Sequence, residues 1–159
     1  MNNTGTDLFA GFCEAAPPQF SQPAHTPQLT PLVLAYVGDS VYEVYVRGML
    51  AQSMNGSVHK LHLEATEYVR CASQADVIHS IYDSLSEGEQ DIVRRGRNSN
   101  SGYVPRNADV TEYRYATGFE ALLGYLYMRR EYGRLDQILN LAVKRVAARS
   151  AESGITNAE

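Results

Sequence analysis

The nine residues ATGFEALLG, at positions 116–124, place one acidic residue, Glu120, and two glycines inside a strongly apolar pattern. Apolar side chains recur at three- and four-residue steps over residues 109–131, which predicts a helix with a buried face. A glycine inside a helix costs about 1 kcal/mol relative to alanine, so Gly118 and Gly124 need a reason. The reason that we expect is a close crossing with a second helix.

The partner that we expect is a helix from about Pro31 to Ala51, because Thr30 is a suitable N-cap and proline is tolerated at the first helical position. At 100° per residue, Asp39 points away from the apolar stripe of this helix. Gly38, beside Asp39, predicts that the two helices cross here and bring Asp39 and Glu120 to a shared cation. The predicted stripe consists of Leu34, Val37, Val41, Val44 and Gly48.

Two other interpretations of these acids stay open. Glu43 follows Asp39 by four residues and shares its helix face, but paired acids on a solvated face often serve only solubility. Glu120 could instead form an ion pair with an arginine such as Arg114, with the glycines reflecting tight packing alone.

The rest of the chain predicts an all-α fold of five to seven helices. Residues 57–82 have helical spacing in one or two pieces, and Ser86 with Glu89 forms a capping-box pattern before a short helix to about Arg95. Residues 96–105 are polar and contain glycine, which predicts a surface loop. A last helix follows Gly133. No alternating strand pattern and no internal repeat is present in the sequence.

Length and composition predict one soluble domain. The 159 residues are 44% hydrophobic and 20% charged, and no apolar run approaches the roughly 20 residues of a membrane-spanning helix. We therefore expect a cytoplasmic protein with no membrane partner. The expected organisation is a disordered leader over residues 1–26, a domain over 27–149 and a polar tail over 150–159. Cys13 and Cys71 predict neither a disulfide nor a zinc site, and Cys71 is interpreted as a small core residue.

The net charge of −4 counts against a polyanionic partner, but the charge is unevenly distributed. From Asp91 to Arg114 there are five arginines and three acidic residues. An acidic protein with such a segment can bind a polyanion while other carboxylates hold a metal ion.

Two motifs carry a resemblance to a known family. Residues 34–41, LAYVGDSV, are similar to the ribonuclease III signature, and residues 119–124, FEALLG, resemble its second acidic motif. The order and separation of the two motifs make the match far more specific than either alone. Residues 95–98, RGRN, and 113–127 extend the resemblance to the Mini-III branch. It covers about residues 27–149, with no double-stranded-RNA-binding domain after it, as in that branch.

This resemblance implies an endoribonuclease that cleaves double-stranded RNA with Mg²⁺, or Mn²⁺ in its place, and leaves 5′-phosphate and 3′-hydroxyl ends. Asp39 and Glu120 are then the catalytic metal ligands, and Glu43 assists through a water molecule. The chain departs from the usual family pattern at two positions, because Ala35 and Thr117 stand where acidic ligands are expected. Two of the four acidic ligands are therefore missing.

The resemblance also implies partners. Without a separate RNA-binding domain, phosphate contacts should come from the arginine-rich segment and from Lys60, unless these are merely a solvated loop and an exposed helix start. A symmetric homodimer should use Tyr36, Val37 and Val41, although the same residues could be core. The candidate RNA-binding residues in that segment are Arg94, Arg95, Arg97, Asn98, Arg106 and Arg114.

The branch implies maturation of the ends of 23S ribosomal RNA precursors, with assistance from a ribosomal protein as a further expectation. Two rival hypotheses are a catalytically weak RNA-binding or ribosome-assembly module on the same fold, and a helical protein-interaction domain with no RNA role. The missing acids at Ala35 and Thr117 motivate the first rival.

Overall fold

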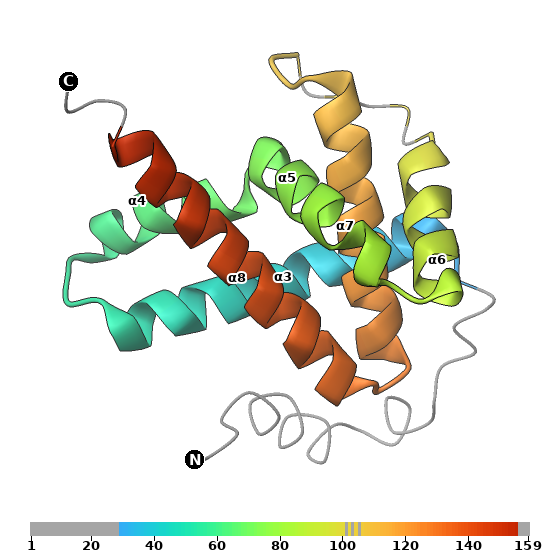
Figure 1. The fold of residues 1–159 in the computed structure, drawn as a ribbon, viewed down its shortest axis with the longest axis horizontal. Helices are drawn as coiled ribbons and strands as arrows, with labels where there is room; N and C mark the ends of the chain where they lie inside the picture. Colours follow the sequence, from blue (N-terminus) through green and yellow to red (C-terminus); the bar gives the residue numbers. More distant parts are fainter. Residues whose placement is uncertain (1–28, 101, 103, 105, 156–159) are drawn as a thin grey trace.

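The computed structural model describes residues 29–100, 102, 104 and 106–155, and within them the fold is all-α, as predicted (Figure 1). The predicted leader and Cys13 lie outside the described residues. The elements are α3 (Pro31–Ser53), α4 (Val58–Val69), α5 (Cys71–Ile81), the short 3₁₀ helix η2 (Tyr82–Ser84), α6 (Glu87–Asn98), α7 (Val110–Met128) and α8 (Tyr132–Ile155).

The centre of the molecule is a crossing of α3 and α7 in which the two backbones touch (Figure 1). A β-carbon on Gly38 would lie 1.8 Å from the Glu120 carbonyl oxygen, and one on Gly124 would lie 1.9 Å from the Leu34 carbonyl oxygen. No side chain fits at either position. The predicted crossing is therefore confirmed at Gly38 and Gly124, whereas Gly118 packs against α6 and not against α3.

A second glycine contact joins α7 to α6, which lies beside it (Figure 1). A β-carbon on Gly118 would lie 2.8 Å from the Val93 carbonyl oxygen, and one on Gly96 would lie 2.9 Å from the Gly118 α-carbon. Since α7 is packed closely against both α3 and α6, its rotation and height are fixed, and so is the position of Glu120.

The core surrounds the crossing and includes Tyr42 and Phe119, which are fully buried in an edge-to-face pair with centroids 5.2 Å apart. The predicted apolar stripe of α3 was wrong at Val44, which is 57% exposed. Because α3 packs against both α4 and α7, its buried face is wider and differently oriented than a single stripe. The buried residues of α3 are Leu34, Ala35, Gly38, Val41, Tyr42, Val46 and Leu50.

The N-caps predicted at Thr30 and Ser86 are present, whereas several helices end at residues other than those predicted. Thr30 accepts a hydrogen bond from the Val33 amide, and the capping box of Ser86 and Glu89 is fully formed. However, α6 continues to Asn98 and includes residues predicted as loop.

The last two helices also differ from the prediction at their ends. The chain turns between α7 and α8 at Arg130, whose φ of 60° is left-handed. The last helix was predicted to follow Gly133, but α8 begins at Tyr132 and includes this glycine. It continues to Ile155 and so includes the first residues of the predicted tail.

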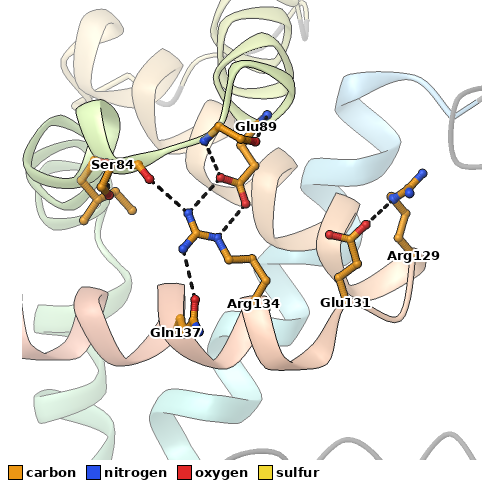
Figure 2. Close-up of polar contacts among 8 residues, drawn as sticks. Ser84, Glu89, Arg129, Glu131, Arg134 and Gln137 are labelled. Carbon is orange, nitrogen blue, oxygen red and sulfur yellow. Dashed lines mark hydrogen bonds and ion pairs between the residues drawn. The ribbon is translucent and has the colours of Figure 1, made fainter.

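An ion-pair network fixes α8 to the start of α6 (Figure 2). The Arg134 guanidinium donates to both carboxylate oxygens of Glu89, at 2.8 and 2.9 Å. It also donates to the Ser84 carbonyl at 3.3 Å and to Gln137 Oε1 at 3.2 Å. Glu89 is 7% exposed, so Arg134 neutralises a buried charge while Glu89 caps its own helix.

Candidate active site

The structure brings Asp39 of α3 and Glu120 of α7 together, because the residue before Asp39 touches the Glu120 backbone. Burial and the negative charge of Asp39 raise the pKa of Glu120 to about 8, and the amide of Gln74 partly opposes this shift. Partial burial and the Glu43 carboxylate raise the pKa of Asp39. At the helix crossing, Asp39 therefore opposes the ionisation of Glu120.

Neither acid is neutralised by a cation within the described part of the chain. The salt bridges found there involve other carboxylates, so the alternative in which Glu120 pairs with Arg114 is wrong. Glu43 is engaged differently, since its carboxylate accepts a hydrogen bond of 2.5 Å from Arg47 Nε. Asp39 and Glu120 therefore lie together with no cation paired to either of them among the described residues.

Such a pair suits a hard divalent cation. Mg²⁺ prefers oxygen ligands and keeps several of its waters, so two protein carboxylates can be enough to hold it. Burial and the Asp39 charge raise the pKa of Glu120, and a cation would offset both effects. Over the described residues, no group of three or more acidic, histidine or cysteine side chains is placed to hold a metal ion. The donor set of Asp39 and Glu120 fits Mg²⁺, with few protein ligands.

The two positions that lack an acid are occupied by side chains that do not replace it. Ala35 is 6% exposed and packs in the core. Thr117 is 8% exposed, and its hydroxyl donates to the Tyr113 carbonyl of its own helix at 3.0 Å. Neither side chain therefore supplies the metal ligand that the family pattern has at its position.

Helix α5 contributes two neighbours that sequence reasoning missed. Cys71 was interpreted as a core residue, but it is only half-buried, and burial followed by the charge of Glu120 raises the pKa of its thiol. Gln74 is 1% exposed and lies beside Glu120. No local pattern marks either residue, because the packing of α5 on α7 alone brings them to the acids.

The best RNA-binding candidates lie on α6 and not in a loop. Arg94 and Arg95 are exposed, and Arg94 pairs with Asp91. Arg97 donates to the Tyr115 hydroxyl at 3.3 Å and lies over its ring at 5.4 Å, so the arginine is held in place. The remaining candidates Asn98, Arg106, Arg114 and Lys60 are all exposed, and Lys60 lies on α4, across the molecule from α6 (Figure 1).

A hollow of about 260 Å³ lies between α5, α6 and α7, next to Arg97. The Tyr115 ring forms part of its wall and contacts the His79 ring, with centroids 4.1 Å apart. The Tyr115 ring therefore contacts both Arg97 and His79. The hollow is lined by Ile78, His79, Tyr82, Asp83, Arg97 and Tyr115.

The three predicted dimer residues differ in exposure. Tyr36 is 78% exposed and lies on α3 with two further exposed apolar residues, Val33 and Val44. Val37 is half-buried against the core. Val41 is 6% exposed and belongs to the core, so it has little surface for a partner.

None of the described helices is both long and apolar enough to cross a membrane.

Comparisons with known proteins agree on one family. The Ribonuclease III domain family matches residues 32–131. The Mini-ribonuclease 3 of Thermoanaerobacter sp. (strain X514) is 53% identical over 116 residues, which are 73% of this chain and 82% of the relative. The Mini-ribonuclease 3 of Enterococcus faecalis is 42% identical over 121 residues, 75% of this chain and 92% of the relative.

A solved structure also resembles the fold. The crystal structure of a protein from Fusobacterium nucleatum superposes with a TM-score of 0.67 at 26% identity, and the match covers 74% of this chain and 93% of that one.

Proposed function

Because the chain belongs to the ribonuclease III family, and within it to the Mini-ribonuclease 3 group, we propose that it is an endoribonuclease that hydrolyses double-stranded RNA with the help of Mg²⁺. The observation that carries this proposal is the pair of Asp39 and Glu120 at the crossing of α3 and α7. Mn²⁺, which also accepts carboxylate ligands, is expected to substitute.

In the proposed mechanism, the ionised carboxylates of Asp39 and Glu120 would hold the cation. A divalent ion at this position supplies charge neutralisation for the phosphate, activation of water and stabilisation of the leaving 3′ oxygen. Glu120 must lose its proton to act as a ligand, and both its burial and the Asp39 charge oppose this loss. The products would carry 5′-phosphate and 3′-hydroxyl ends.

The duplex would be bound by arginines and not by a separate domain. The exposed Arg94 and Arg95 of α6 can reach phosphates, and Arg97 is fixed by its contact with Tyr115. Phosphate contacts release counterions, so RNA affinity should fall steeply with added salt. A homodimer would provide two such surfaces, and exposed Tyr36 supports an interface on α3.

The proposal is tested by cleavage of a structured RNA duplex by the purified protein with Mg²⁺. We expect wild-type cleavage to require Mg²⁺ or Mn²⁺, and Asp39→Asn to lose at least about a hundredfold in rate because one of two ligands is removed. Glu64→Gln, which alters an exposed carboxylate of α4, is the matched control and should cleave normally.

Two outcomes would count against the enzyme. Binding of RNA without cleavage would favour a ribosome-assembly or RNA-binding module, for which Ala35 and Thr117 are the supporting observation. If the affinity for RNA changes neither with salt concentration nor in Arg95→Ala, a protein-interaction domain would be favoured.

We also propose precursors of 23S ribosomal RNA as the cellular substrate, in the cytoplasm and with assistance from a ribosomal protein, as the resemblance to the Mini-III branch implies. The test compares 23S precursor ends in cells that carry the wild-type protein or Asp39→Asn. Mature ends in both strains would overturn this choice of substrate and leave the duplex-cleavage proposal standing.

A further inference from the structure

Gln74 is a buried amide at the junction of α4 and α5. It is 1% exposed, and its Nε2 donates to the carbonyl of Val69, the last residue of α4, at 2.9 Å. This bond fixes which way the amide faces, since a rotated amide would place its oxygen against the Val69 oxygen. The side chain is therefore held in one orientation.

The fixed amide is not satisfied by its structural contacts. Its Oε1 is buried and, within the described part of the chain, has no hydrogen-bond partner. A buried acceptor without a partner destabilises a protein, and such groups are rare in native structures. The bond to Val69 uses only one of the two Nε2 hydrogens, so the amide is able to interact with a second group.

The other neighbour of the amide is Glu120. The Nε2 group carries two hydrogens, and Val69 accepts only one of them. Gln74 comes near Glu120 because α5 packs on α7. The second Nε2 hydrogen is therefore available to the Glu120 carboxylate, with which the amide interacts.

We propose that Gln74 is a positioning residue that holds the Glu120 carboxylate in the orientation needed to bind a divalent cation. This inference rests on the proposed function. With Ala35 and Thr117 in place of two acids, only two protein carboxylates remain, so the orientation of each has a larger effect on affinity. Groups that orient a ligand typically change metal affinity ten- to a hundredfold when they are removed.

The first experiment measures Mn²⁺ binding to the full-length protein without RNA, by the electron paramagnetic resonance signal of free Mn²⁺. Gln74→Met keeps the length of the side chain and removes the amide, and it should raise the Mn²⁺ dissociation constant about tenfold or more. Ser73→Ala is the matched control, because the Ser73 hydroxyl donates to the Glu67 carbonyl at 2.6 Å in the same junction. It should lower the melting temperature and leave Mn²⁺ affinity unchanged.

The kinetic result should separate positioning from substrate binding. In Gln74→Met we expect the Mg²⁺ concentration for half-maximal cleavage to rise about tenfold, while the KM for RNA stays within about twofold of wild type. A merely structural role predicts parallel effects of Gln74→Met and Ser73→Ala in every measurement.

A second experiment needs no variant of Gln74 and covers the case in which Gln74→Met does not fold. In a Mg²⁺ titration of the wild-type protein labelled with ¹³C and ¹⁵N, the Gln74 side-chain NH₂ signal should shift with the same midpoint as the Glu120 carboxyl ¹³C signal, and Asp39→Asn should abolish both shifts. An unmoved Gln74 signal, or equal Mn²⁺ affinity in wild type and Gln74→Met, overturns the role of Gln74 alone. A wild-type protein that binds no Mn²⁺ overturns the proposed metal site as well.

Discussion

Glu120 makes the stability of the metal-free protein depend on pH. Its pKa is about 8 in the folded state, against 4.5 ordinarily, so between these values the folded chain holds a proton that the unfolded chain has lost. The free energy of unfolding should therefore fall as pH rises from about 4.5 to 8.

Glu120→Gln should remove this fall, because the amide has nothing to ionise. At pH 8 in a chelator, we expect the variant to be more stable than wild type by about 1–3 kcal/mol, although it should not cleave RNA. Urea unfolding at pH 5 and pH 8 measures both proteins. A wild-type curve with the same midpoint at the two pH values would contradict the environment described for Glu120.

At the scale of helices, the crossing of α3 and α7 can be tested with two glycines of the same helix. In Gly38→Ala the new methyl group would lie 1.8 Å from the Glu120 carbonyl oxygen, so the helices must separate. The free energy of unfolding should therefore fall by at least about 3 kcal/mol. Gly48→Ala meets nothing within 4 Å and should stabilise the protein by up to about 1 kcal/mol. Thermal unfolding of the two variants should therefore give shifts of opposite sign.

The contact between α6 and α8 depends on Arg134. In Arg134→Met the carboxylate of Glu89, 7% exposed, would lose its cation, and we expect a loss of about 2 kcal/mol at neutral pH. Bonds to Arg134 lower the pKa of Glu89, so this contribution is present above its ordinary pKa and is lost as pH falls below it.

Glu67→Gln is the control for Arg134→Met, because it breaks the exposed pair with Arg70 and should change stability by less than about 0.5 kcal/mol. Denaturant midpoints at pH 7 and pH 3 distinguish the two cases. If Arg134→Met is equally destabilising at both pH values, the charge of Glu89 does not contribute to the stability of the network.

How much of these helices could be predicted depends on how local their causes are. The capping box at Ser86 was readable because its two partners are three residues apart. The glycines at 38 and 124 predicted the crossing because each costs stability unless a backbone lies against it. Exposed Val44 could not be predicted, since which face of α3 is buried depends on where α4 and α7 pack. Gln74 was missed for the same reason.

At the scale of the whole molecule, exposed apolar residues on α3 predict self-association. Tyr36 is 78% exposed beside Val33 and Val44, and burial of such a face in a second copy would remove it from water. Tyr36→Asp should raise the dimer dissociation constant at least about tenfold, as measured by sedimentation velocity. Val58→Asp, at an 83% exposed apolar position on α4, should leave self-association unchanged. A wild-type protein that sediments as a monomer at high concentration would contradict the homodimer.

The contact between α3 and α7 is made by main-chain atoms at Gly38 and Gly124. The spacing of the two acids is thus set by peptide geometry and not by how aliphatic side chains fill the interior. Core residues could therefore be exchanged for others of similar volume, to raise the melting temperature, without changing the spacing of the two acids. Directed evolution, in contrast, should find positions 38 and 124 closed to every side chain larger than hydrogen.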